Sequence, residues 1–241
     1  MTLSSKRVSA LLFPSVITLA LLAGCGGGGG STSSVSLPPL SAPIPLIEGQ
    51  QIGDNFFAAP NSNGQTVDNN ACDVDHFDYH IHSHLSIFLN GRQLAIPSAI
   101  GIKNPRFETS VKYPDGFAIY GDCVYLLHTH DTSGRLHVEA PEVRTFTLGE
   151  VFRIWGKPLT RENIAGIVDG PVVIYIKDSN GLRRYDGDPA AIPLASKKEI
   201  TIQIGSQIPI IPTYQWFGEP DNGVASAADA EHFKLKSSAK K

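Results

Sequence analysis

Residues 79–91, which read YHIHSHLSIFLNG, decide the fold. Apolar side chains alternate with histidine and serine along this stretch, which predicts a strand with one apolar and one polar face. Asn90-Gly91 is a strong signal for a two-residue hairpin turn, and residues 92–97 then return as a second strand. Because alternate residues of a strand share a face, three histidines project from its polar side, namely His80, His82 and His84.

The chain on either side of this hairpin is also strand-like. The pattern predicts a strand over 124–131 that turns at Ser133-Gly134 into 135–140, a hairpin over 172–177 that turns at Asn180-Gly181, and an alternating strand over 199–205. Thr147 and Glu150 form a capping box for a short helix over 148–155, and 160–164 is a further possible turn. We therefore expect a mainly β domain, a compact β-sandwich or partly open barrel built of hairpins, with one or two short helices.

A second group of histidines lies further along the chain. His128 and His130 share one face of the strand predicted over 124–131, and His137 follows the turn. A two-residue turn at Ser133-Gly134 places His130 opposite His137 and His128 opposite Glu139. Directly opposed side chains have Cβ atoms about 4.5–5.5 Å apart, so one hairpin face would carry three imidazoles and one carboxylate.

This donor set is typical of a metal site. Imidazoles with a carboxylate suit Zn²⁺ or Cu²⁺. Met1 is the only methionine, which excludes a methionine-rich cuprous site. We expect His128, His130, His137 and Glu139 to be the first ligands, and His80, His82 and His84 to form a companion or completing set. Whether both groups hold one ion stays open, as does the metal. Asp75, Asp78, Asp122 and Asp131 are candidates for carboxylates that orient the imidazoles.

The cysteines indicate an oxidising compartment. Cys72 and Cys123 form an even pair once Cys25 is assigned to a lipid, and a disulfide is their natural interpretation. Two separate thiol ligands are the alternative. A disulfide would also exclude a blue-copper site, which needs a cysteine ligand.

The N-terminus has the features of a secretory leader. Lys6 and Arg7 precede an apolar run that closes with Leu22-Ala23-Gly24-Cys25, which resembles the lipobox of bacterial lipoproteins. A buried helix or a membrane anchor is the alternative, but the run of about 15 residues is short for a span. We expect a signal peptide over 1–24, acylated Cys25 with a Gly/Ser/Pro-rich tether over 25–50, one β-rich domain over 51–217 and a tail over 218–241. Gly26 follows the cysteine, with no Asp at that position. This resembles lipoproteins sorted to the outer membrane and implies the periplasmic face of that membrane.

Other functional classes find little support in the sequence. The formal net charge of −3 gives no electrostatic footprint for a nucleic acid. The His-x-His pairs lack the carboxylate spacing of cupins and the Asp-His pair of metallo-β-lactamases, and the chain has no Gly-x-Ser-x-Gly elbow. The sequence therefore assigns no catalytic residues.

The histidine motifs resemble those of an uncharacterised family of exported bacterial and archaeal proteins. The resemblance is carried by residues 80–85 (HIHSHL), by residues 127–139 (LHTHDTSGRLHVE) followed by 146–149 (FTLG), and by Gly187-Asp188-Pro189 with Ile192-Pro193-Leu194. The resemblance covers roughly residues 76–217. It implies a shared histidine site and no particular reaction.

These observations lead to three hypotheses. The leading one is a membrane-tethered periplasmic protein that binds zinc or copper, with the lipid membrane as partner through Cys25. The second is a metal-dependent enzyme, a hydrolase or copper oxidoreductase, that uses the same residues with a bound water. The third is a cell-envelope binding module without metal, in which the histidines respond to pH. The sequence names no protein partner.

Overall fold

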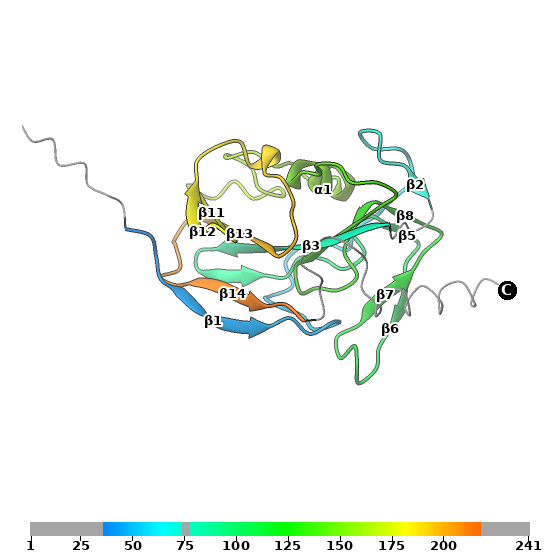
Figure 1. Ribbon diagram of the computed structural model, residues 1–241, viewed down its shortest axis with the longest axis horizontal. Coiled ribbons are helices and arrows are strands. Elements are labelled where there is room, and N and C mark those ends of the chain that lie inside the picture. The colour runs from blue at the N-terminus through cyan, green and yellow to red at the C-terminus, as the bar shows by residue number, and fades with distance from the viewer. Residues whose placement is uncertain (1–35, 74–77, 218–241) are drawn as a thin grey trace, which may run out of the picture. The chain divides into compact units, whose positions relative to one another are not determined.

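The computed structural model describes residues 36–73 and 78–217. Its largest element is a seven-stranded sheet (Figure 1). The strands lie in the order β12 (Gly181–Tyr185), β11 (Val172–Asp178), β13 (Lys198–Ile204), β3 (Tyr79–Leu89), β10 (Arg135–Ala140) and β9 (Leu127–His128), with β4 (Arg92–Leu94) paired to β3. This path ends at β12 and β9, so the sheet is open. The prediction of a mainly β fold is confirmed.

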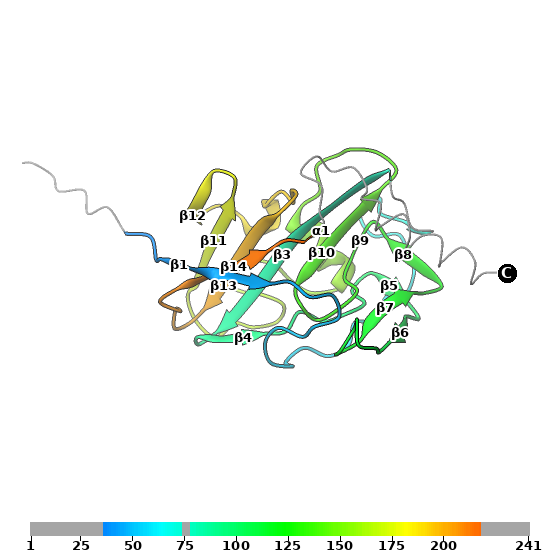
Figure 2. The same ribbon diagram turned by 60° about the horizontal axis from the view of Figure 1, so that its bottom comes forward.

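Three smaller sheets contain the other described strands. One is the parallel pair β1 (Leu40–Pro45) and β14 (Ile211–Gln215), which crosses a face of the main sheet (Figure 2). The second is formed by β2 (Cys72–Asp73), β8 (Cys123–Tyr125) and β5 (Ile102–Lys103). The third is the antiparallel pair β6 (Arg106–Glu108) and β7 (Phe117–Tyr120).

One face of the main sheet packs on the helix α1 (Leu148–Trp155), which lies over it in Figure 1. The capping box predicted for this helix is present, because Thr147 accepts from the Glu150 amide and the Glu150 side chain accepts from the Thr147 amide. Phe152 and Trp155 join the hydrophobic core with Ile81 and Leu85 of β3. A single 3-10 turn, η1 (Pro189–Ala191), contacts α1.

The opposite face of β3 contains His80, His82, His84 and Ser86. Near the end of β3, Ser86 lies 2.8 Å from the Tyr214 hydroxyl of β14. The beginning of β3 pairs with β10, and β10 pairs with β9. The histidines of the sheet therefore lie on three neighbouring strands, β3, β10 and β9.

One of the two predicted Asn-Gly hairpins turns at its Asn-Gly pair, and the other turns one residue earlier. Leu89 pairs with Arg92, and the intervening Asn90 and Gly91 have φ of 50° and 82°, as a type I′ turn requires. Asp178 pairs with Gly181 in the β11–β12 hairpin, so the two turn residues are Ser179 and Asn180, and the turn predicted at Asn180-Gly181 is displaced by one residue. The strand predicted over 199–205 is β13, displaced by one residue.

The strand predicted over 124–131 is wrong as a continuous element. It breaks at Leu126 into β8, which pairs with β2 and β5, and β9, which pairs with β10. The chain beyond His128 belongs to the connection to β10, because Thr129 exchanges backbone hydrogen bonds with the 99–100 loop, at 2.8 Å to Ala99 and 3.0 Å to Ile100. These partners are distant in sequence, so the local pattern could not show the break.

The tether predicted over 25–50 also ends earlier than expected. Residues 40–45 form β1, and Leu46 is buried. The side chains of β1 are mostly exposed and include two prolines, so this edge strand has no apolar alternation and is held by its backbone pairing with β14. The signal peptide over 1–24, Cys25 and the tail over 218–241 lie outside the described residues.

The predicted disulfide is present between Cys72 and Cys123, whose Cα atoms are 5.3 Å apart. It joins β2 to the start of β8, two strands that also pair by backbone hydrogen bonds. Among the residues described, no helix has the length and apolar character needed to cross a membrane.

Candidate metal centre

Three histidines form one row across the three neighbouring strands. His137 of β10 is the register partner of His82 on β3 and of His128 on β9. Glu139, two residues further along β10, is opposite His80. The predicted pairings of His130 with His137 and of His128 with Glu139 are therefore wrong by two residues. The shift keeps the side chains on the same face, because strand residues alternate with a period of two.

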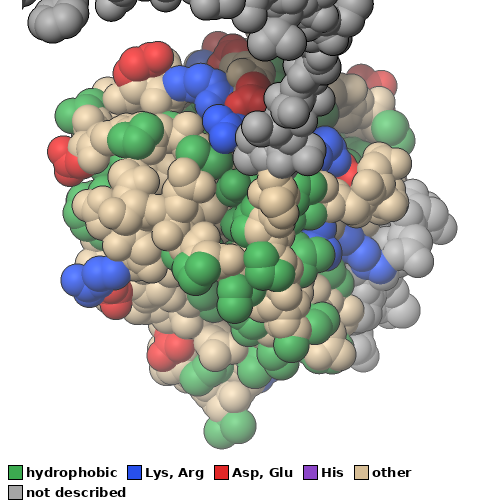
Figure 3. Space-filling model, turned by 90° about the vertical axis from the view of Figure 1, so that its left-hand side faces the viewer, with side chains coloured by type: hydrophobic (Ala, Val, Ile, Leu, Met, Phe, Trp, Pro, Cys, Tyr) green, Lys and Arg blue, Asp and Glu red, His purple; other side chains and the backbone are tan. Residues whose placement is uncertain are grey.

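The six side chains that meet here are buried. His80, His82, His128, His130, His137 and Glu139 each expose between 1% and 8% of their surface. The one face drawn in Figure 3 shows no histidine; it shows hydrophobic side chains, other side chains and backbone, and scattered charges of both signs. Buried polar atoms need partners, so five buried imidazoles in one place call for a common ligand or a network of hydrogen bonds.

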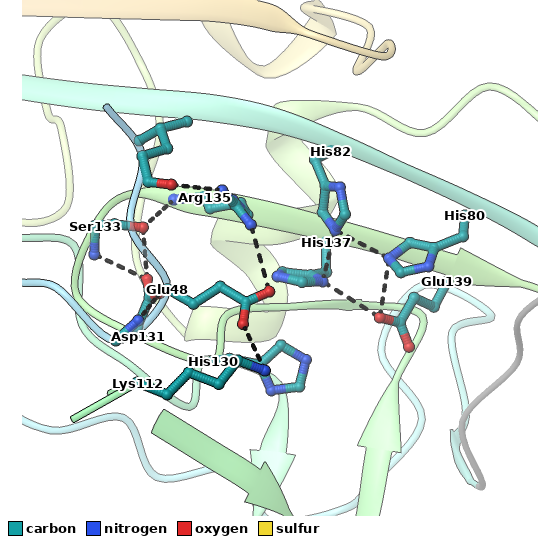
Figure 4. Close-up of polar contacts among 12 residues, drawn as sticks. Glu48, His80, His82, Lys112, His130, Asp131, Ser133, Arg135, His137 and Glu139 are labelled. Atoms are coloured by element: carbon teal, nitrogen blue, oxygen red, sulfur yellow. Dashed lines mark hydrogen bonds and ion pairs between the residues drawn. The ribbon is translucent and has the colours of Figure 1, made fainter. Parts of the chain in front are cut away.

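Contacts among the donors join the strands into one cluster, and Figure 4 shows the part of it formed by His80, His82, His137 and Glu139. Nε2 of His82 lies 2.9 Å from Nε2 of His80 and 3.0 Å from Nδ1 of His137. Oε1 of Glu139 lies 3.2 Å from both Nε2 of His80 and Nδ1 of His137, and 3.5 Å from Nε2 of His128. Glu139 is thus the contact shared by residues of all three strands.

Backbone carbonyls set the orientation of two rings. Nδ1 of His128 donates to the carbonyl of Tyr125 at 2.9 Å, and Nδ1 of His130 donates to the carbonyl of Ala118. A carbonyl only accepts, so each Nδ1 carries a proton and each neutral ring has its lone pair on Nε2. Those two Nε2 atoms face each other at 3.1 Å. Such outer hydrogen bonds are how metal-ligating histidines are fixed in proteins.

Aromatic stacking holds His130, which lies beyond the end of β9. Its ring stacks on Phe117 of β7 with centroids 4.6 Å apart, and Phe117 stacks in turn on Tyr113. The amide of Ala118 donates to the His130 carbonyl at 2.7 Å. The β6–β7 pair therefore positions this histidine, and no pattern near residues 128–137 indicated that contact.

Hydrogen bonds to Asp131 hold the connection between β9 and β10. The Asp131 carboxylate accepts from the Ser133 amide at 2.9 Å and from the Gly49 amide at 2.8 Å (Figure 4). Burial raises the pKa of Asp131 despite these hydrogen bonds. The prediction that this residue orients an imidazole is wrong, since its hydrogen bonds come from Ser133 in the turn and from Gly49.

The other aspartates predicted to orient the rings do not reach them either. Asp122 is exposed and accepts from Asn104, and Asp78 is exposed as well. Asp75 and His76 lie outside the described residues, as does His232. The orienting acceptors are instead main-chain carbonyls, which a residue pattern cannot reveal.

His84 shares the strand face with His80 and His82 but lies apart from the cluster. Its Nε2 donates to the Ser133 carbonyl at 2.8 Å, and its ring packs on Tyr214 at 3.6 Å between centroids. Burial lowers the pKa of His84 to about 3, so the ring is neutral near pH 7. The turn and β14 occupy this ring, and the structure does not bring it to the other five histidines.

The electrostatics of the cluster favour a neutral His137 beside an anionic Glu139. Burial, together with neighbouring His82 and His130, lowers the pKa of His137 well below its ordinary value. Burial alone would raise the pKa of Glu139, but contacts with His128, His137 and His80 hold it well below its usual range. Oε2 of Glu139 is buried and has no hydrogen-bond partner within residues 36–73 and 78–217.

The donor atoms fall into two overlapping groups that can hold a metal ion. One contains His128, His130, His137 and Glu139, and the other contains His80, His82 and His137, with ligand atoms within 4.8 Å of one another in each. Two nitrogens bound to one ion at ~2.05 Å are about 2.9 Å apart at a right angle and about 3.4 Å apart in a tetrahedron. The observed nitrogen separations of 2.9, 3.0 and 3.1 Å lie in this range.

Family models, curated proteins and solved structures were each searched with this chain, and none of them matches it.

Proposed function

We propose that this chain is an exported, lipid-anchored protein that binds Zn²⁺ or Cu²⁺ through the buried histidine cluster. The observation that carries the proposal is the pair of Nε2 atoms of His128 and His130 at 3.1 Å. Because both Nδ1 atoms donate to carbonyls, two neutral rings would set lone pair against lone pair. A cation between them turns that repulsion into coordination.

A proton held between the two nitrogens would join only those two atoms. A metal ion instead contacts several donors at once and is matched by the charge of Glu139. The buried Oε2 of Glu139, without a hydrogen-bond partner among the described residues, is a further acceptor that a cation would satisfy. The donor chemistry therefore favours a metal.

The ligand types at the site limit which metal ions it would bind. Cys72 and Cys123 are joined to each other, so neither offers a thiolate. Imidazole nitrogen and carboxylate oxygen are ligands for both Zn²⁺ and Cu²⁺, so the ligand types leave both metals open. We propose binding rather than catalysis because the donors are buried and contact one another. A surface cavity of about 240 Å³ near Phe57, Pro97 and Thr132 contains none of the six donors.

Export and lipidation complete the proposal. The leader with its Leu22-Ala23-Gly24-Cys25 ending supports acylation of Cys25, and the disulfide fits an oxidising compartment such as the periplasm. Two or more acyl chains anchor a protein stably, since each buried methylene contributes about 0.8 kcal/mol. The outer membrane is the proposed location.

The test of metal binding is elemental analysis of the full-length chain, purified without a histidine tag. We expect bound zinc or copper in the unaltered protein and its loss from the variant with His128, His130 and His137 all changed to Ala. His84→Gln is the matched control, because this histidine lies on the same strand face outside the cluster and glutamine keeps a donor for Ser133. A chain that neither carries nor takes up metal at micromolar concentrations would overturn the proposal and leave the non-metal binding module.

The test of anchoring is separate. The Cys25→Ala chain should fail to incorporate labelled fatty acid and should leave the membrane fraction, while its metal content stays unchanged. Equal fatty-acid labelling of both chains would contradict lipidation at Cys25 without bearing on the metal site.

A further inference from the structure

We propose that the cluster holds two metal ions, one on each side of β10, with Glu139 as the bridging ligand. This rests on the proposed metal-binding function and specifies its stoichiometry. The two donor groups lie on opposite neighbours of β10: His80 and His82 on β3, and His128 and His130 on and after β9. Residues of β10 supply the donors between them.

The number of donors exceeds what one zinc ion uses. Protein zinc sites are almost always four-coordinate, whereas six buried side chains converge here. A single ion at His128, His130, His137 and Glu139 would leave His80 and His82 as additional buried imidazoles in direct contact. A second ion gives those rings a common partner.

The contacts of His82 point the same way. Its Nε2 lies 2.9 Å from a nitrogen of His80 and 3.0 Å from a nitrogen of His137. An imidazole nitrogen offers either one N–H or one lone pair, so it makes a single in-plane hydrogen bond. One N–H or one lone pair therefore serves both neighbours less well than coordination does, and three nitrogens at these separations suit the coordination of one ion.

Glu139 is placed to join the two ions. Its Oε1 lies 3.2 Å from Nε2 of His80 in one group and 3.5 Å from Nε2 of His128 in the other. Its Oε2 is buried and lacks a hydrogen-bond partner in the described chain, which leaves a second carboxylate oxygen for coordination. Two-metal sites in proteins have ions about 3.5–4 Å apart, a distance that one carboxylate spans. Solvent hydroxide or chloride would balance the remaining positive charge.

Titration of the metal-free full chain with Zn²⁺, followed by elemental analysis after gel filtration, tests this directly. We expect about two equivalents in the unaltered chain and about one in each of two variants, H80Q/H82Q and H128Q/H130Q. The control variant H84Q should retain two. Circular dichroism and retention of the disulfide establish that each variant is folded.

Copper provides a second readout. Two Cu²⁺ ions at about 3.5–4 Å couple magnetically, so the paramagnetic signal should rise with the first equivalent and fall with the second. X-ray absorption of the zinc form should show a metal–metal vector at the same distance. One equivalent in the unaltered chain, with five or six nitrogen and oxygen ligands and no such vector, would overturn the two-ion site while leaving the proposed function standing. Absence of metal uptake would overturn both.

Discussion

The amide of Leu85 donates a hydrogen bond of 2.9 Å to the carbonyl of Gly134, where the turn before β10 meets the middle of β3. Gly134 has a φ of 90°, and a Cβ atom built on it would lie 2.3 Å from the Leu85 carbonyl oxygen. This close approach fixes the start of β10 against β3. It therefore sets the register that brings His137 beside His82.

Replacement of Gly134 tests that contact. Gly181 is the matched control, because its φ of 88° is almost the same but a Cβ there meets no atom within 4 Å. Gly181→Ala should cost about 1–2 kcal/mol of unfolding free energy through its left-handed backbone alone. Gly134→Ala adds a clash with backbone and should cost at least about 1–2 kcal/mol more, together with weaker zinc binding. Denaturant unfolding of both variants measures the difference, and equal losses would show that the close approach is unimportant.

The tautomers of the cluster can be observed by NMR. His128 and His130 donate from Nδ1, so their Nε2 atoms should be unprotonated in the neutral rings and should become the zinc ligands. His84 donates from Nε2 and should show the opposite tautomer, unchanged by zinc. Long-range proton–nitrogen correlations recorded with and without zinc distinguish the two patterns. A protonated Nε2 on His128 or His130 in the zinc-loaded protein would rule out the assigned ligand atoms.

The disulfide should stabilise the fold without forming the site. Cys72 and Cys123 are 51 residues apart in sequence, and closing a loop of that length contributes about 4 kcal/mol on the chain-entropy model. The C72A/C123A variant should lose stability of this order in denaturant unfolding. Its zinc stoichiometry in native buffer should match that of the unaltered chain, because neither sulfur belongs to the donor groups. A variant that stays folded but loses zinc would place a cysteine in the site.

Removal of metal should lower the melting temperature. A ligand that binds only the folded state, present at a thousand times its dissociation constant, contributes about 4 kcal/mol. For a domain of this size that corresponds to a shift of roughly 8–16 °C. Calorimetry before and after chelation measures the shift, and the chain with His128, His130 and His137 changed to Ala should show none. A melting temperature that is insensitive to chelator in the unaltered protein would contradict a buried site.

Local pattern was sufficient for the individual elements. The alternation over 79–89 predicts the full length of β3, and the pair Thr147 and Glu150 predicts the bounds of α1. Both signals depend on neighbours within a few residues: strand side chains alternate at every step, and a capping box closes within one helical turn. The cysteine pairing was predicted from the number of cysteines and needed no information about their positions in the fold.

The sequence by itself also determined which histidines share a strand face, because the parity of their numbers fixes the side to which they point. Only the tertiary structure decided which of them meet. Contacts of Thr129 with the 99–100 loop and of Asp131 with Gly49 lengthen the turn and shift the register by two residues. His84 hydrogen-bonds to Ser133 and packs on Tyr214, so it lies outside the cluster. His130 hydrogen-bonds to Ala118 and stacks on Phe117, and these contacts hold it in the cluster. These partners are remote along the chain, and the free energy that selects them comes from packing between elements, which local periodicity does not encode.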